Sequence, residues 1–231
     1  QKKLADLLRY RTTKSGQEFI PLRTYVERMQ EGQKEIYYIT GENLSALLNS
    51  PHLERLKEKD IEVLLMGDPV DEWVVQGLEE YDGKKLKSAE KGDLGLDAVD
   101  EKKKDEYQAL FGFIKVQLQE KIREVRPSTR LIDSVACLTG EAWDMSAYME
   151  KILKASGQKT PEVKRVLELN MEHPLMERIR TLFEAQRDDP RLKSYSELLL
   201  DMALIGEGGK LEDPARFSKT IGDMMAEALS S

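Results

Sequence analysis

The sequence predicts a mixed fold of the α+β and α/β types: a small three-layer αβα sandwich, then an α+β domain with a short three-stranded sheet and two C-terminal helices. Three observations carry this prediction. Between residues 22 and 88, helical patterns alternate with short apolar runs in the order αβαβαβ. From residue 105 onward, helical patterns enclose three short strand-like runs. A charge-dense stretch poor in large apolar side chains separates the two regions.

The first elements follow from leucine spacing and from breaker residues. Residues 1–10 carry leucines at helical spacing and predict an amphipathic helix, and residues 12–16 predict a polar loop. Pro21 suits the first turn of a helix. Gly32 can supply the left-handed residue that ends this helix, whose apolar face holds Tyr25, Val26 and Met29.

Two strands and their helices complete the predicted sandwich. The runs 36–39 and 61–66 are β-branched or almost wholly apolar, as expected of strands in a covered sheet. Asn43 is a helix cap, and Pro51 should split the helical pattern between the strands into two pieces. Asp68 and Pro69 open another helix, and residues 84–88 predict a short edge strand.

The second domain opens with a helix whose apolar face includes Tyr107 and Leu118. Strands are predicted at 123–128, 134–139 and 166–169, with Pro127 marking an edge or a bulge. Helices are predicted at 145–155 and after Pro174. The predicted domains are therefore residues 1–90 and 105–231, joined by a solvated charged linker at 91–104.

Two amphipathic helices close the chain, the second started by the strong signal Asp213-Pro214. Terminal helices of this kind have little left to bury against, so a second copy could cover them in a four-helix bundle. Folding back onto their own domain is the alternative. The predicted dimer interface is the apolar face of both helices: Leu192, Tyr195, Leu198, Leu199, Met202, Ile205, Phe217, Ile221, Met224 and Leu229.

Composition excludes several classes of protein. The chain of 231 residues has a net charge of −7, which disfavours nucleic-acid binding. No apolar run reaches the roughly 18 residues of a membrane span. The single cysteine, Cys137, excludes an internal disulfide and has apolar neighbours typical of a buried, inert thiol. The chain starts with Gln1 inside a helical pattern, and we expect it to be a fragment of a longer protein.

The sequence offers no catalytic residues, no metal ligands and no phosphate-binding loop. His52 and His173 lack partners at metal-ligand spacing and predict structural or surface roles. An independent small α/β enzyme would need a polar constellation near residues 40–43 and 67–71, where strands end. Only Asp68 and Asp71 are candidates there, and both are better explained as helix-start residues.

A stripe of apolar side chains offers a binding function instead. Met145, Met149 and Ile152 recur at helical spacing, and unbranched thioethers suit promiscuous apolar recognition. Packing of this stripe on its own sheet is the alternative, which periodicity alone favours. Trp73 poses the same question, because its helix has other core residues available.

Long segments of the chain closely resemble the ninety-kilodalton heat-shock chaperone family, in particular its bacterial type. The resemblance rests on YVERMQEGQKEIYYITGE at 25–42, SPHLERLKEK at 50–59, DEWVVQGLEEYDGKKL at 71–86, RLIDSVACL at 130–138, MSAYMEKIL at 145–153, LELNMEHPL at 167–175 and LEDPARF at 211–217. It implies that residues 1 to about 90 end a middle domain and that about 105–231 form the dimerisation domain.

The resemblance also implies a function for this chain. The parent protein is expected to be an ATP- and Mg-dependent ATPase, whose nucleotide pocket and catalytic arginine lie upstream of Gln1. This chain should therefore bind no cofactor and catalyse no reaction. Client contacts in the family fall, by position, on Glu72, Trp73 and Gln76 and on Met145, Met149 and Ile152.

Partners and location are expected from the same resemblance. They are a second copy of the chain, non-native client proteins and co-chaperones, in the cytoplasm of a bacterium or in an organelle. The chain ends in ALSS without an acidic MEEVD tail, so co-chaperones that dock on that tail are not expected. A passive dimerisation scaffold without a client surface is the alternative function.

Overall fold

The computed structural model describes residues 2–160 and 163–229, and the chain divides into two compact units. The first unit comprises Gln1–Asp97 and Thr139–Val163, and the second comprises Ala98–Leu138 and Lys164–Ser231. The chain therefore passes from one unit to the other three times. Residues 139–163, which the sequence analysis grouped with the second domain, cluster with the first unit. The domain boundaries drawn from the sequence stay a prediction.

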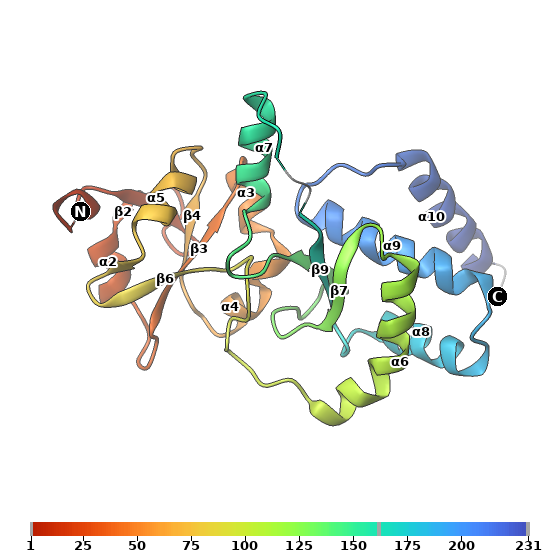
Figure 1. The fold of residues 1–231 in the computed structure, drawn as a ribbon. Coiled ribbons are helices and arrows are strands. Elements are labelled where there is room, and N and C mark those ends of the chain that lie inside the picture. Colours follow the sequence, from red (N-terminus) through yellow and green to blue (C-terminus); the bar gives the residue numbers. More distant parts are fainter. Residues whose placement is uncertain (1, 161–162, 230–231) are drawn as a thin grey trace. The chain divides into compact units, whose positions relative to one another are not determined.

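The first unit is built on a six-stranded sheet in the order β2-β1-β4-β3-β6-β5 (Figure 1). Its centre is parallel and consists of β4 (Val63–Met66), β3 (Glu35–Thr40) and β6 (Lys84–Ser88). Antiparallel strands extend both sides: β1 (Arg9–Thr12) and β2 (Ile20–Pro21) beside β4, and β5 (Glu80–Tyr81) beside β6. The three parallel strands confirm the αβαβαβ prediction, whereas β1, β2 and β5 were not predicted.

The predicted helix over residues 1–10 is wrong for most of its length. Helix α1 covers only Lys2–Ala5, and β1 starts at Arg9. Tyr10 and Thr12 are buried, and β1 pairs with β4 through Arg11 and Leu65. Pairing with a fully buried strand satisfies the backbone of residues 9–12 better than a short helix at the surface would.

Helices cover both faces of this sheet, which confirms the three-layer sandwich. Val63 and Leu65 of β4 face a core formed with α3 (Leu44–Leu48), η1 (Pro51–Leu53) and α4 (Glu54–Glu58). Leu64 and Met66 face the opposite core, formed with α2 (Leu22–Glu27) and α5 (Asp71–Gly77). Each fully buried aliphatic side chain contributes about 1.5–3 kcal/mol, so this strand anchors both layers.

Asn43 and Pro51 act as predicted at helix ends, whereas Gly32 does not. The side chain of Asn43 accepts hydrogen bonds from the backbone N–H groups of Ser45 and Ala46 and so caps α3. Pro51 begins η1 and separates it from α3. Gly32 has φ of +83°, a backbone conformation that favours glycine, but α2 ends at Glu27 with Arg28 as its C-cap, so Gly32 lies in the following turn and does not end the helix as predicted.

The second unit packs helices against a three-stranded sheet in the order β7-β9-β8. Its strands are β7 (Ile122–Pro127), β8 (Ala136–Thr139) and β9 (Arg165–Leu169), and its helices are α6 (Glu101–Gln117), α8 (Pro174–Ala185), α9 (Pro190–Gly206) and α10 (Pro214–Leu229). The three predicted strands are confirmed. Pro127 ends β7, which lies at the edge of the sheet as the proline predicted. The register of β7 shifts at its other end, between Ile122 and Glu124. Helix α6 starts at Glu101, inside the predicted linker.

An ion pair lies at one end of this sheet. Arg130 is only 1% exposed, and its guanidinium donates to the Glu168 carboxylate through Nε at 2.9 Å and Nη2 at 3.2 Å. Ser128 donates to the same carboxylate at 3.0 Å. A buried guanidinium is tolerated only when it is paired and hydrogen-bonded in this way.

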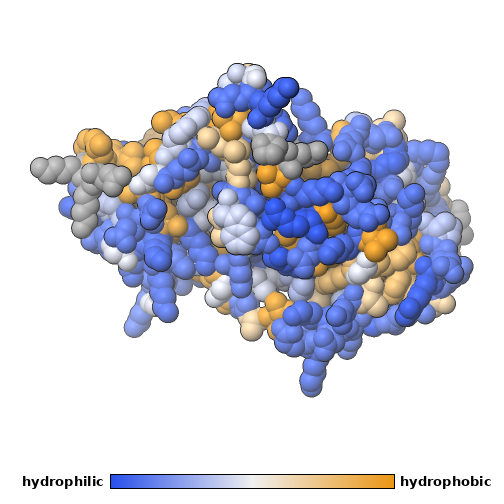
Figure 2. All heavy atoms as spheres, in the orientation of Figure 1, coloured by the Kyte–Doolittle hydropathy of each residue, from blue (hydrophilic) through white to orange (hydrophobic). Residues whose placement is uncertain are grey.

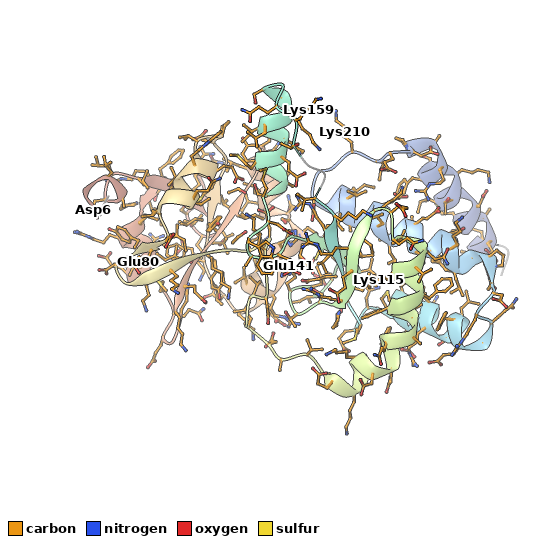
Figure 3. The ribbon with its side chains drawn as sticks, viewed as in Figure 1. Asp6, Glu80, Lys115, Glu141, Lys159 and Lys210 are labelled. Atoms are coloured by element: carbon orange, nitrogen blue, oxygen red, sulfur yellow. The ribbon has the colours of Figure 1, made fainter. Side chains whose placement is uncertain are left out.

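The outer surfaces of both units are charged. Exposed side chains such as Glu80 in the first unit and Lys115 in the second project into solvent (Figure 3). Among the described residues, no helix combines the length and apolar character needed to cross a lipid bilayer.

Candidate functional site

Two segments predicted to contact clients meet within the first unit. Ser146, which lies just before α7 (Ala147–Ala155), donates a 2.6 Å hydrogen bond to Oε1 of Glu72 on α5. Both residues are at least nine-tenths buried. The Tyr148 hydroxyl donates to the carbonyl of Gly67, next to β4, at 3.4 Å. The candidate site is therefore one surface formed by α5 and the start of α7, although the sequence placed these helices in different domains.

The three predicted residues of α5 differ in exposure. Glu72 is 3% exposed and fixes α7 through Ser146, so its position suits a structural anchor. Trp73 is 47% exposed, and Gln76 is also exposed. A half-exposed indole on a short helix presents apolar area to solvent beside a polar amide. Trp73 and Gln76 are the residues of this group that another molecule could touch directly.

The predicted stripe on α7 is shorter than its spacing indicated. Ser146 caps the helix by accepting a 2.9 Å hydrogen bond from the backbone N–H of Met149, so the helix begins at Ala147 and Met145 precedes it. Met149 is buried at 7% exposure, whereas Met145 and Ile152 are half-buried. The structure thus leaves Met145 and Ile152 partly accessible and packs Met149 into the first unit.

Carboxylates give this region a negative field. Burial raises the pKa of Tyr148, and the nearby side chains of Glu42, Asp68, Asp71 and Glu72 raise it further. The Tyr148 hydroxyl therefore stays a donor, in keeping with its bond to Gly67. The candidate site combines a protruding indole with acidic surroundings.

A second candidate surface lies on α9 and α10 of the second unit. Leu192, Leu198 and Leu199 are buried in that unit's own core, while Tyr195 is half-buried. Met202 and Ile205 are 37% and 45% exposed. The ten predicted interface residues therefore divide between the core and the surface.

Helix α10 buries none of its described residues. Phe217, Ile221 and Met224 are half-buried, and Leu229 is 87% exposed. Arg216 ties α10 to α9 by ion pairs with Glu197 at 2.7 Å and Asp201 at 2.5 Å. Burial raises the pKa of Asp201, and the positive charge of Arg216 partly offsets this increase. Ion pairs therefore connect this amphipathic helix to its neighbour, and the helix adds no fully buried residue to the core.

Sequence reasoning missed two features of these surfaces. Met225, 61% exposed, adds to the accessible side of α10, and its place beside Met224 was the available signal. The Ser146–Glu72 bond joins residues far apart in sequence, and no local pattern indicated it. On the visible face of the molecule, hydrophilic residues predominate and apolar residues form small patches between them (Figure 2).

Other chemistry-bearing residues have structural roles in the described chain. His173 caps α8 by accepting a hydrogen bond from the backbone N–H of Leu175 through Nδ1 at 3.1 Å. His52 and Cys137 are buried. Within residues 2–160 and 163–229, no group of three or more His, Cys, Asp or Glu side chains is arranged to hold a metal ion.

Comparison with known proteins gives a consistent result. The family model described as "Hsp90 protein" matches residues 1–231. The chain is 47% identical to "Chaperone protein HtpG" of Geobacter sulfurreducens over 96% of its own length and 36% of that protein. It is 46% identical to the protein of the same name from Geobacter metallireducens, over 97% of this chain and 36% of that protein. It is 44% identical to the protein of the same name from Frankia casuarinae, over 90% of this chain and 33% of that protein. The chain spans about a third of the length of these relatives.

Proposed function

Because this chain belongs to the Hsp90 family of chaperones, we propose that it is the dimerising and client-contacting portion of an ATP-dependent molecular chaperone. The relatives are about three times longer than the alignment, so ATP and Mg binding and ATP hydrolysis are assigned to parts of the parent protein outside this chain. We assign the parent to the bacterial cytoplasm, with co-chaperones as further partners. The clients are proteins that expose apolar segments.

The observation that carries the dimer is the unburied α10. A helix of 16 residues with an apolar face and no buried residue gains little from its own chain. A second copy of α9 and α10 would cover Met202, Ile205, Ile221 and Met225 in a four-helix bundle. Such an interface is self-complementary, as two-fold symmetry requires.

Sedimentation of the chain at micromolar concentration tests this dimer. The chain should sediment as a dimer, and Ile221→Asp should sediment as a monomer with unchanged helical content. Lys219 lies on the opposite side of α10 and is exposed, so Lys219→Asp is the matched control and should stay dimeric. If the unmodified chain were monomeric, or if the Ile221→Asp variant were still a dimer, the proposed dimer interface would be wrong.

Trp73, Met145 and Ile152 support the client surface, because they leave apolar area accessible within one compact unit. Glu72 and Met149 support it indirectly by holding α5 and α7 in place. Suppression of aggregation of a destabilised client should weaken in Trp73→Ala and in Met145→Asp. Val116→Asp, at a 61% exposed position of α6, is the control and should act like the unmodified chain. Equal suppression by all four proteins would favour a passive dimerisation scaffold.

A further inference from the structure

A cavity of about 590 Å³ opens at the carboxyl ends of β3 and β4 in the first unit. Strand β1 runs antiparallel to β4, which brings Tyr10 to the point where β4 leads into Gly67 and Asp68. In open α/β sheets, ligands bind in the crevice outside the carboxyl ends of the strands. This place in the fold therefore has the position of a binding site.

The polar lining of the cavity includes three carboxylates. Glu42, Asp68 and Asp71 line it, and none of the three forms an ion pair with a residue that the structure describes. Asp71 is 6% exposed, and its Oδ2 accepts a 3.0 Å hydrogen bond from the backbone N–H of Asp68. Burial, followed by the charges of Asp68 and Glu72, raises the pKa of Asp71 to about 6. A positive group beside Asp71 would favour its ionised form and so offset this penalty.

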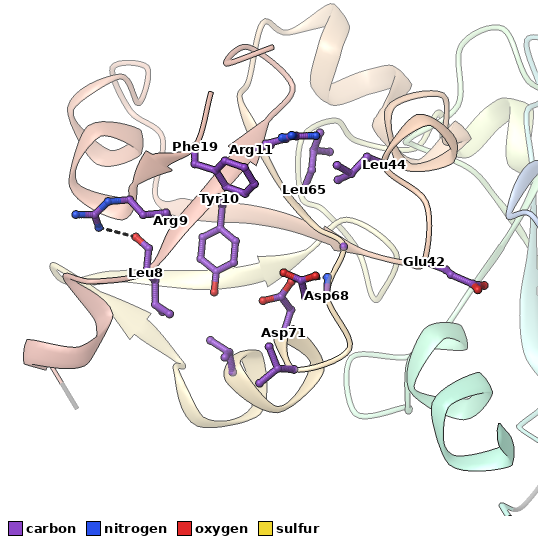
Figure 4. Close-up of a pocket in the computed structure, with 13 residues that line it drawn as sticks. Leu8, Arg9, Tyr10, Arg11, Phe19, Glu42, Leu44, Leu65, Asp68 and Asp71 are labelled. Atoms are coloured by element: carbon purple, nitrogen blue, oxygen red, sulfur yellow. Dashed lines mark hydrogen bonds between the residues drawn. The ribbon is translucent and has the colours of Figure 1, made fainter. Parts of the chain in front are cut away.

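A buried hydroxyl is directed at the same point. Tyr10 is 5% exposed, and its hydroxyl has no hydrogen-bond partner among the described residues. Its ring points the hydroxyl toward Asp68 and Asp71 (Figure 4). An unpaired buried hydroxyl costs free energy, and here it leaves an acceptor and a donor available to a ligand.

Two arginines of the protein also line the cavity, but their guanidinium groups lie away from Asp68 and Asp71 (Figure 4). The Arg9 guanidinium donates to the carbonyls of Asp6 and Leu8 at 2.8 and 2.9 Å. The Arg11 guanidinium lies 4.8 Å from the centre of the Phe19 ring. Both point away from the aspartate pair (Figure 4), so neither neutralises it.

The remaining walls are aliphatic or aromatic, which distinguishes the cavity from a metal site. The apolar lining residues are Leu8, Phe19, Leu44, Leu65, Val70 and Val74. Phe19 and Val70 form an exposed rim, with 60% and 61% of their surface accessible. An aliphatic stem that ends in a cation matches these walls and this acidic floor.

We propose that this cavity binds the side chain of a lysine or arginine that is flanked by apolar residues in a client polypeptide. The client, rather than a free amine, is indicated because α5 carries both Asp71 and the exposed Trp73 of the proposed client surface. The inference rests on the proposed client-binding function and adds a charge requirement to it.

Methyl-labelled chain and three probes test the proposal. The probes are an acetylated peptide amide Ser-Leu-Lys-Leu-Ser, the same peptide with norleucine in place of lysine, and n-butylammonium chloride. The lysine peptide should shift the methyl resonances of Leu65, Val70 and Val74, and the other two probes should bind there at least about tenfold more weakly. Equal binding by the norleucine peptide, or by n-butylammonium, would overturn the proposal.

Variants separate this cavity from the rest of the surface. Asp68→Asn and Tyr10→Phe should each weaken the lysine peptide about threefold, since an exposed charge or one hydrogen bond contributes about 0.5–1 kcal/mol. Tyr10→Phe should fold normally, because the hydroxyl it removes has no described partner. Glu79 is exposed and does not line the cavity, so Glu79→Gln is the matched control and should bind as the unmodified chain does.

Two failures can be told apart. Peptides that shift Trp73 indole resonances but not the cavity methyls would overturn this inference and leave the client surface standing. Peptides that shift neither, with no suppression of client aggregation, would overturn both.

Discussion

The hydroxyl of Tyr25 is the part of the first unit whose removal has the most calculable cost. Tyr25 is 1% exposed and joins α2 to two strand segments. Its hydroxyl donates to the carbonyl of Glu62 at 2.6 Å and accepts from the backbone N–H of Tyr37 at 3.0 Å and from Nε2 of Gln33 at 3.2 Å. Burial raises its pKa to about 12, so it stays protonated at neutral pH. Tyr25→Phe removes all three bonds without changing the ring.

The magnitude follows from what each partner can do afterwards. The Glu62 carbonyl and the Tyr37 N–H are buried and would be left unsatisfied, at about 1–2 kcal/mol each. Gln33 is half-buried and already donates to the carbonyl of Glu35, so losing its bond to Tyr25 adds little to the cost of the substitution. We expect the free energy of unfolding of the first unit to fall by about 3 kcal/mol.

Native-state hydrogen exchange of the β3 amides measures this change directly. Protection of the Tyr37 amide should fall by about two orders of magnitude, since 1.4 kcal/mol is a factor of ten. Tyr148→Phe is the control, because its hydroxyl makes a single bond of 3.4 Å to Gly67; it should cost under about 1 kcal/mol. A Tyr25→Phe protein as stable as Tyr148→Phe would refute the reasoning.

Three further predictions concern a buried ion pair, a buried carboxyl and a close backbone approach. Arg130→Met should destabilise the second unit by about 3–5 kcal/mol in urea unfolding, because it removes the buried guanidinium that pairs with the Glu168 carboxylate. Asp71→Asn should raise the free energy of unfolding by about 2–3 kcal/mol at pH 8 and by almost nothing at pH 4. The sign follows from the raised pKa: the folded state binds the Asp71 proton more tightly, so its ionisation penalty grows as pH rises from about 4 to 6 and is complete above that. Gly209→Ala should lower the melting temperature, because an added Cβ would lie 2.8 Å from the carbonyl oxygen of Leu204.

Each of these has a control at a similar residue. Arg126→Met removes an exposed partner of Glu124 and should cost under about 1 kcal/mol. Asp82→Asn should change the free energy of unfolding by under about 1 kcal/mol, since Asp82 is exposed in a turn. Gly112→Ala, at an open position inside α6, should stabilise by up to about 1 kcal/mol. If any control matched its partner variant, the corresponding argument would fail.

Much of the fold was predictable because its signals are local. The apolar run at 63–66 is a strand buried on both faces, and Asn43 and Asp213 cap helices as their sequence contexts predicted. What escaped prediction depends on pairing across the chain. Residues 9–12 form a strand because β4 is there to receive them, and their alternating burial is too short a signal to outweigh the leucines before them.

The candidate site was only partly predictable for the same reason. The exposure of Trp73 is compatible with its helical pattern, but the pattern could not decide between a core and a surface position. Met149 is buried and Glu72 is an anchor because Ser146 joins their two helices, and this bond spans 74 positions of sequence. The position of Tyr10 in the acidic cavity was not predicted, because residues 1–10 were expected to form a helix.

The order of strands in the second unit has a consequence for synthesis of the chain. Its central strand, β9, follows β7 and β8 in sequence, and a segment that belongs to the first unit is inserted before it. When the growing chain has emerged only as far as β8, both β7 and β8 are present. The strand that lies between them in the sheet, β9, has not yet been made, so neither can pair with it. Unpaired strand edges attract other chains. The emerging polypeptide would pass through an aggregation-prone interval that ends only when residues 165–169 arrive, so this member of a chaperone family would itself depend on protection while it is being made.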